Sequence, residues 1–210
     1  MIQKIIDYLD YLFPNPKCEL KYSKDYELLL AVMMSAQTTD KRVNIVTDKL
    51  FKKYDSLEKL SLADINDIIE IIRPIGTFNK KASNIINISK SLLNDKNGVV
   101  PNDRDYLESL DGVGRKTTNV VLSNLFNEPY IAVDTHVSRV SKRLNLCKDS
   151  DGVLVIEKKL CKKFPKESLG RLHHQLVLFG RYYCKSNKPL CDNCLLKEMC
   201  KYNLKKSNHL

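Results

Sequence analysis

Apolar residues recur along most of the chain with the spacing of amphipathic helices. Positions 65, 68, 69 and 72 are all isoleucine, which places four apolar side chains on one face of a helix. The same period predicts helices over 26–34, 40–50, 65–72, 82–97, 103–110, 115–126, 135–144, 153–164 and 168–183, with Asp40 as the expected N-cap of the second. No stretch shows the alternation of a half-buried strand. The pattern therefore predicts an all-α fold of roughly nine or ten helices joined by short loops.

The composition is that of a folded protein with a large positive charge. Hydrophobic residues make up 43% of the 210 and charged residues 29%, which argues against disorder. No apolar run approaches the ~20 residues of a membrane span, and the glycines and prolines are few for an all-β fold. The net charge of +10 favours a polyanionic partner such as nucleic acid. A lysine-rich composition bias explains that charge equally well.

The amino-terminal residues, MIQKIID, include an acid and lack the apolar stretch of a signal peptide. We therefore expect no export and a reducing cytoplasm, with association to the nucleoid if the source is a bacterium. The chain has 7 cysteines, and an odd number argues further against a secreted disulfide framework.

Four cysteines near the carboxyl end predict a metal centre. Their pattern, Cys-x6-Cys-x2-Cys-x5-Cys, is formed by Cys184, Cys191, Cys194 and Cys200. Four thiolates so close in a reducing compartment suit either zinc or an iron–sulfur cluster. Zinc sites usually pair two short knuckles, and only one short pair exists here, so the spacing favours iron–sulfur without excluding zinc. The other three cysteines lie in apolar or mixed stretches and are expected to be small buried hydrophobes.

Two glycines mark a tight corner between the helices predicted at 103–110 and 115–126. Gly112 and Gly114 flank Val113, and Arg115 follows. Glycines permit the turn and remove side chains that would block a close backbone approach. Free N–H groups beside the positive end of a helix form a phosphate cradle, which would grip a nucleic-acid backbone without reading bases. An ordinary helix–helix corner is the alternative interpretation.

Lys116 comes directly after this corner, in the first turn of the next helix. A cation there is unfavourable against the helix dipole, so the position favours a neutral amine. A neutral amine attacks a sugar C1′ or a carbonyl and forms a Schiff base. The alternative is a lysine that stays charged and contacts phosphate.

Asp134 follows an apolar run and opens the helix predicted at 135–144. It is expected to be an N-cap, and a cap that faces a cleft would also stabilise a developing positive charge. His136 is expected to be a structural histidine, as are His173 and His174.

The residues in these motifs resemble the endonuclease III family, the helix-hairpin-helix DNA glycosylases that carry a [4Fe–4S] cluster. The resemblance rests on LDGVGRKT at 110–117, VDTHV at 133–137 and the four-cysteine pattern, in this order. Further matches are ELLLAVMMSAQTTD at 27–40, and IG at 75–76 followed by KA at 81–82. It implies two helical lobes, a six-helix lobe over 22–132 and a cluster lobe from 1–21 plus 133–210, with DNA bound across the cleft between them. It also implies iron–sulfur rather than zinc.

The resemblance also implies roles for individual residues. Lys116 matches the Schiff-base lysine of the family and Asp134 its catalytic aspartate. Gln37 matches the residue that fills the gap left by a flipped nucleotide. Lys188, in the loop between the first two cluster cysteines, matches a phosphate contact, and Lys185 is expected to assist it.

Two positions depart from the family pattern. Asp111 stands where the family usually has proline, and an acid there weakens the grip on phosphate slightly. Thr77 stands where the family often has a bulky apolar wedge, so Phe78 is the candidate to take over that role. These departures concern DNA contacts and leave the chemistry unchanged.

The implied function is a bifunctional DNA glycosylase and AP lyase of base excision repair. It would remove oxidised pyrimidines from double-stranded DNA and break the strand 3′ to the abasic site by β-elimination, acting as a monomer. Three alternatives differ from it: an adenine glycosylase of the same superfamily, a non-catalytic DNA-binding module and an electron-transfer protein. Lys116 beside the hairpin argues against the first, and Lys116 together with Asp134 against the second. The third leaves the hairpin and the charge unexplained.

Overall fold

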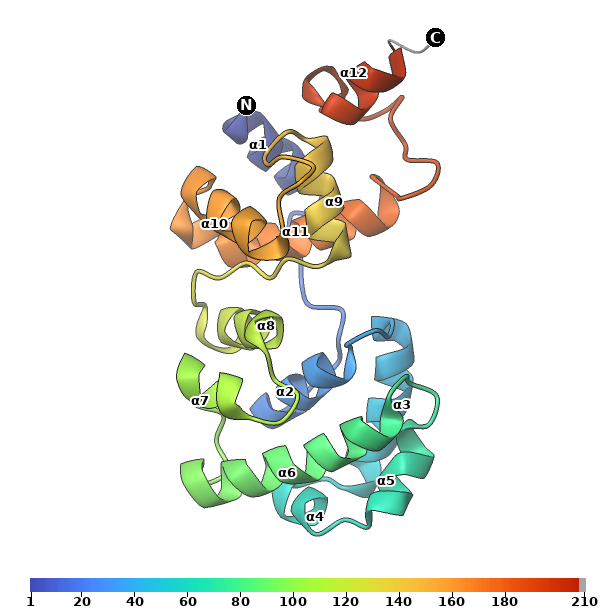
Figure 1. Ribbon diagram of the computed structural model, residues 1–210, viewed down its shortest axis with the longest axis vertical. Helices are drawn as coiled ribbons and strands as arrows, with labels where there is room; N and C mark the ends of the chain where they lie inside the picture. The colour runs from blue at the N-terminus through green and yellow to red at the C-terminus, as the bar shows by residue number, and fades with distance from the viewer. Residues whose placement is uncertain (208–210) are drawn as a thin grey trace. The chain divides into compact units, whose positions relative to one another are not determined.

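The computed structural model describes residues 1–207, and within that range its regular elements are all helices, with no strand, which confirms the all-α prediction (Figure 1). Two 3₁₀ helices, η1 (Lys166–Ser168) and η2 (Lys197–Met199), accompany the α-helices. The α-helices are α1 (Ile2–Leu12), α2 (Asp25–Met34), α3 (Asp40–Lys53), α4 (Leu57–Ser61), α5 (Ile65–Ile72), α6 (Phe78–Lys96), α7 (Arg104–Ser109), α8 (Arg115–Phe126), α9 (Thr135–Arg143), α10 (Val153–Lys163), α11 (Leu169–Tyr182) and α12 (Lys201–Ser207).

Polar side chains cap the first turns of α3, α4, α5, α7 and α9. Asp103 accepts a hydrogen bond from the backbone N–H of Tyr106 and so begins α7, as predicted. The cap of α3 differs from the prediction. The hydroxyl of Thr39 accepts from the N–H of Arg42, and Asp40 is the first helical residue, where its charge favours the helix dipole instead.

The helices form two compact units. The central unit is Cys18–Phe126, and the terminal unit combines Met1–Lys17 with the described chain from Asn127 onward. These boundaries lie a few residues from the lobes expected at 22–132 and at 1–21 with 133–210.

The central unit is built around α2, in which every residue from Tyr26 to Met34 is buried. This explains the uninterrupted apolar run over 28–34, because a helix surrounded by others has no polar face. The buried Glu27 accepts from the N–H groups of Ser23 and Lys24 at the start of the helix. Helices α3, α6 and α8 pack on α2, and α6 also packs along α4 and α5 (Figure 1). The long helix α6 therefore touches most of the unit.

The terminal unit has a core of its own, in which α11 packs against both α1 and α9. Phe179 of α11 is 2% exposed, and its ring meets Tyr8 of α1 edge-on with 6.1 Å between centroids. The same ring stacks on Tyr183 at 5.9 Å. This core holds the beginning of α9 and the end of α11 in place, and both carry candidate residues.

Three helices lie outside the predicted set. Helix α1 buries Ile5, Tyr8 and Leu9 on one face, so it has the amphipathic period, but the prediction did not include it. The other two are short. Helix α4 has five residues, fewer than one full repeat of the amphipathic pattern, and α12 is mostly polar.

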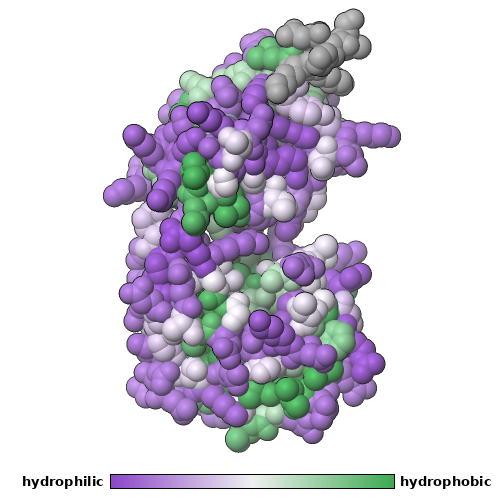
Figure 2. All heavy atoms as spheres, in the orientation of Figure 1, coloured by the Kyte–Doolittle hydropathy of each residue, from purple (hydrophilic) through white to green (hydrophobic). Residues whose placement is uncertain are grey.

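Hydrophilic residues cover much of the face seen in Figure 2. Within residues 1–207, none of the helices combines the length and the apolar character needed to cross a membrane.

Candidate functional site

The hairpin between α7 and α8, in the central unit, has the tight geometry expected from its glycines. The N–H of Val113 donates to the carbonyl of Leu110 at 3.1 Å, and both side chains are buried. Gly112 has a φ of +75°, a left-handed conformation that glycine adopts without strain. A Cβ on Gly112 would lie 2.1 Å from Nδ2 of Asn84 on α6, so both the backbone and the packing require glycine here.

Gly114 differs from Gly112 because no atom of the protein lies within 4 Å of the position that its Cβ would occupy. Packing within the chain therefore gives no reason for glycine at this exposed position. A missing side chain on an open surface leaves room for another molecule to approach the backbone, as a phosphate does in the predicted cradle.

Helix α6 contacts the hairpin through two asparagines. Nδ2 of Asn87 donates to Oδ2 of Asp111 at 2.7 Å, while the buried Asn84 lies against Gly112. Asp111 is therefore hydrogen-bonded to α6, and this contact holds the turn in place.

Lys116 is exposed in the first turn of α8, directly beyond the hairpin. Its side chain is accessible to a ligand that approaches the surface of the central unit. The adjoining Arg115 is exposed as well, so two cations follow the open glycine.

Asp134, in the terminal unit, is the N-cap of α9, as predicted. Its Oδ1 accepts a hydrogen bond from the N–H of Val137 at 2.7 Å. The apolar run Ile131–Val133 is buried and anchors the chain just before it. The carboxylate is half-buried, so it caps the helix and still has accessible surface.

His136 is a packing residue, as expected. A Cβ on Gly180 of α11 would lie 2.8 Å from the Cβ of His136, so α9 and α11 approach closely at this point. Burial lowers the pKa of His136, and the nearby carboxylate of Asp134 opposes that effect without cancelling it. The neighbouring rings of His173 and His174 lie 5.0 Å apart on α11, and burial also lowers the pKa of His174.

Two arginines one turn apart on α9 hold the start of the segment 184–200, which carries the four cysteines and is called the cysteine loop below. None of the sequence motifs pointed to these arginines. Arg139 donates to the carbonyls of Gly180 and Cys184 at 2.8 and 3.2 Å. Arg143 donates to the carbonyls of Lys185 and Ser186 at 2.6 and 3.1 Å, and to Sγ of Cys184 at 3.4 Å. The i, i+4 spacing of Arg139 and Arg143 places both side chains on one face of α9, and this was the sequence signal that could have pointed to them.

None of the four cysteines of the predicted metal centre is in a disulfide. Two of them contact Arg143: Sγ of Cys184 accepts from its guanidinium at 3.4 Å, and Sγ of Cys200 donates to its carbonyl at 3.3 Å. Burial raises the pKa of Cys194, and the thiols of the other three cysteines raise it further, so all four lie within electrostatic reach. Within the described residues 1–207, no three His, Cys, Asp or Glu side chains are already arranged around a metal position. Four thiols suit a four-sulfur centre in their chemistry.

Lys185 and Lys188 lie on the same loop, and both are exposed. Lys188 has a φ of +51°, a left-handed conformation, directly before Pro189. The cysteine loop thus presents two lysines on the surface of the terminal unit.

Two further loops of the central unit carry the residues expected to enter DNA. Gln37 is exposed with a φ of +57°, and Thr77 is exposed with a φ of +55°. Phe78, the first residue of α6, is half-buried. Sequence reasoning gave no role to Lys81, which is buried beneath the first of these loops. It lies on the apolar stripe of α6 with Ile85, where a lysine is unexpected.

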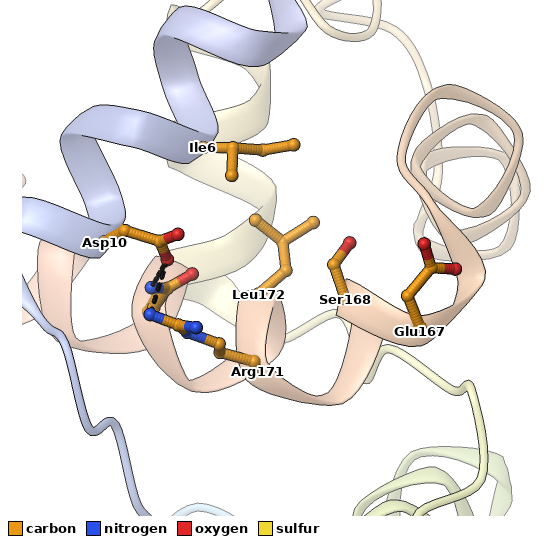
Figure 3. Close-up of a pocket in the computed structure, with 7 residues that line it drawn as sticks. Ile6, Asp10, Glu167, Ser168, Arg171 and Leu172 are labelled. Carbon is orange, nitrogen blue, oxygen red and sulfur yellow. Dashed lines mark hydrogen bonds and ion pairs between the residues drawn. The ribbon is translucent and has the colours of Figure 1, made fainter.

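A hollow in the terminal unit contains none of the candidate residues. Figure 3 shows Asp10 of α1 facing Arg171 of α11, with Glu167 and Ser168 beside them. Oδ1 of Asp10 accepts from Arg171 at 2.8 Å and from Gln175 at 2.7 Å. These polar groups join α1 to α11, which is a structural role.

Comparison with known proteins gives a consistent result. Residues 30–166 match the model of the HhH-GPD superfamily base excision DNA repair proteins. The chain is 46% identical over 205 residues to endonuclease III of Bacillus subtilis (strain 168), covering 98% of this chain and 94% of that one. It is 43% identical over 192 residues to endonuclease III of Escherichia coli (strain K12), covering 91% and 90%.

Two solved structures share both the fold and the sequence. A trapped endonuclease III–DNA covalent intermediate has a TM-score of 0.93 and 45% identity, covering 98% of this chain and 97% of that chain. A non-covalent endonuclease III–DNA complex has a TM-score of 0.94 and 45% identity, covering 99% and 97%.

Alanine substitution of the two hairpin glycines should have unequal effects on stability. Gly112→Ala should lower the melting temperature, because the left-handed backbone alone costs about 1–2 kcal/mol and the overlap with Asn84 adds to it. Gly114→Ala, the matched control, should leave it nearly unchanged or slightly raised. Thermal unfolding followed by circular dichroism measures both, and equal destabilisation would contradict the assigned packing.

Proposed function

Because the chain belongs to the endonuclease III family of the HhH-GPD superfamily, it is a DNA glycosylase and AP lyase of base excision repair, and we propose that Lys116 and Asp134 carry its chemistry. The observation that carries the assignment is the exposed amine of Lys116 directly beyond a hairpin whose Gly114 faces open space. That a structural relative has been trapped as a covalent DNA intermediate supports a nucleophilic side chain.

In the first step, the neutral amine of Lys116 attacks C1′ of the damaged nucleotide. A C1′–N bond to the lysine forms while the bond to the base breaks, and the base leaves with the bonding electrons and takes up a proton. Positive charge develops on the sugar as the base departs. The carboxylate of Asp134, held in orientation by the N–H of Val137, stabilises that charge.

In the second step, the C1′–O4′ bond breaks, O4′ takes the bonding electrons and a proton to become a hydroxyl, and the nitrogen lone pair forms the C1′=N bond of an iminium. The iminium withdraws electrons from C2′ and so acidifies its proton. Loss of that proton forms a C1′–C2′ enamine, and its electrons expel the 3′ phosphate oxygen. The strand is therefore broken 3′ to the lesion, and hydrolysis of the imine releases Lys116 for another cycle.

The substrate that we propose is double-stranded DNA containing an oxidised pyrimidine or an abasic site. An oxidised base stacks and pairs poorly, so its extrusion costs less free energy than that of a normal base. Backbone N–H groups of the hairpin 112–115 would hold phosphate, and Lys185 and Lys188 would do so from the cysteine loop. Gln37 would fill the vacated position, with Thr77 and Phe78 beside it.

We propose that Cys184, Cys191, Cys194 and Cys200 hold a [4Fe–4S] cluster. Their spacing and four-thiol chemistry support this, as does the hydrogen bond from Arg143 to Sγ of Cys184. The cluster would supply structural cross-linking of a basic loop, and no step of the reaction passes through it.

We also propose that the protein acts as a monomer in the cytoplasm, at the nucleoid in a bacterium.

Trapping with borohydride tests the chemistry. With an abasic duplex and borohydride, the protein should form a covalent adduct, because the reagent reduces the iminium to a stable amine. Lys116→Arg keeps the charge and should form none. Asp134→Asn keeps the cap through its amide oxygen and should lower the single-turnover rate by about 10²-fold or more, with little change in melting temperature. Trapping in Lys116→Arg would remove the lysine from the mechanism.

The phosphate role of Lys188 has its own test. Lys188→Ala should weaken binding to duplex DNA and reduce the slope of log K against log salt by about 1, because one fewer counterion is released. Lys52→Ala is the charge-matched control, since its amine is already paired with Asp48 at 2.9 Å. Fluorescence anisotropy at several salt concentrations gives both slopes, and identical slopes in both variants would exclude the contact.

The cluster predicts a coloured protein. Purified without chelator, the chain should absorb at about 400 nm and contain iron and sulfide, whereas a zinc protein would be colourless. Cys194→Ser should lose most of both, and Cys161→Ser, outside the four-cysteine pattern, should retain them. Stoichiometric zinc without iron would overturn the assignment.

A further inference from the structure

Lys81 is a buried lysine whose amine is bound by uncharged oxygens. Its residue is only 4% exposed, and Nζ donates to the carbonyl of Ala36 at 2.8 Å and to Oγ1 of Thr38 at 3.4 Å. Burial lowers its pKa, which reflects the cost of removing the charge from water. A methionine would fill the same space without that cost, so the hydrogen bonds are the reason for a lysine.

These hydrogen bonds fix the loop that carries Gln37. The carbonyl of Ala36 belongs to the peptide directly before Gln37, and Thr38 directly follows it. Gln37 is an exposed non-glycine residue in the left-handed region, a conformation that persists only where its surroundings enforce it. Lys81 contacts the chain on both sides of this strained residue.

The same lysine also contacts the second strained loop. Its backbone N–H donates to the carbonyl of Thr77 at 3.1 Å, in the first turn of α6. Thr77 is β-branched and left-handed, which is a stronger departure from ordinary backbone preferences than that of Gln37. The bond to the Thr77 carbonyl is the ordinary first hydrogen bond of α6 and does not depend on the side chain at position 81. It places Lys81 one turn from Thr77, so the amine of Lys81 ties the loop of Gln37 to that turn.

We propose that Lys81 is a positioning residue. Its amine ties the loop of Gln37 to the first turn of α6, where Thr77 and Phe78 lie, so that the two segments together open the DNA duplex. This inference rests on the proposed function, which assigns both segments to the DNA surface. A loop held in its bound conformation loses little conformational entropy when it enters the base stack. The free energy of binding is then available to hold the duplex open rather than to order the protein.

The experiment compares one lesion in two contexts. Lys81→Met keeps the length of the side chain and removes its donors, and Lys80→Met changes the exposed neighbour as the matched control. Single-turnover cleavage is measured on an abasic site in a fully paired duplex and on the same site inside an unpaired bubble. Lys81→Met should slow cleavage about tenfold or more on the duplex but less than about twofold in the bubble, where no wedge is needed.

Two further measurements separate positioning from stability. Replacing a buried charge with an apolar side chain should leave the melting temperature unchanged or raise it, whereas a structural role predicts that it falls. Lys81→Arg retains a charged donor and should recover most of the duplex rate. In a Gln37→Gly background, the effect of Lys81→Met should shrink, because glycine needs no support in the left-handed region.

The outcomes are distinct. Equal loss on duplex and bubble, with a lower melting temperature, would make Lys81 a structural residue and overturn the inference. An unchanged duplex rate in Lys81→Met would overturn it too, while trapping that depends on Lys116 would leave the proposed function intact. Absence of trapping in the unaltered protein would overturn both. Thr38→Val, which removes one acceptor at the surface, repeats the comparison if Lys81→Met does not fold.

Discussion

The organisation of the central unit depends on the close approach of α6 to the hairpin at Gly112. A Cβ at that position would overlap with Asn84, so the two elements are as near as a backbone and a side chain allow. Asn87, one turn further along α6, binds Asp111 in the same hairpin. The direction in which α8 begins, and with it the place of Lys116, follows from this contact.

Helix α6 also contacts the loops that carry Gln37 and Thr77. Thr77 caps its beginning, and Lys81 binds the loop that carries Gln37. Positions 77, 81, 84 and 87 follow the i, i+3, i+4 spacing of one helix face, so one stripe of α6 organises all three candidate DNA-contacting segments. In the terminal unit α9 has a comparable role. Asp134 caps its start, and Arg143 near its end holds the cysteine loop.

Much of this could be predicted from the sequence, because helical periodicity and caps are local properties. The helical class, the corner at 110–114 and the cap at Asp134 follow from residue order alone. The roles of Lys81, Arg139 and Arg143 could not, since they depend on which carbonyls the tertiary fold brings near each side chain. Thr39 and Asp40 both have side chains that can cap a helix, so the residue order does not distinguish them. The extended backbone of Thr39 makes it the cap of α3.

The three loops on α6 are fixed by hydrogen bonds and steric contact before any ligand arrives, so this surface has little capacity to adapt its shape. Under the proposed function, the deformation on binding must fall on the nucleic acid, whose local stiffness then decides where the complex forms. Selectivity becomes a mechanical property of the duplex: a step weakened by damage yields to a preformed surface, and an intact one resists it.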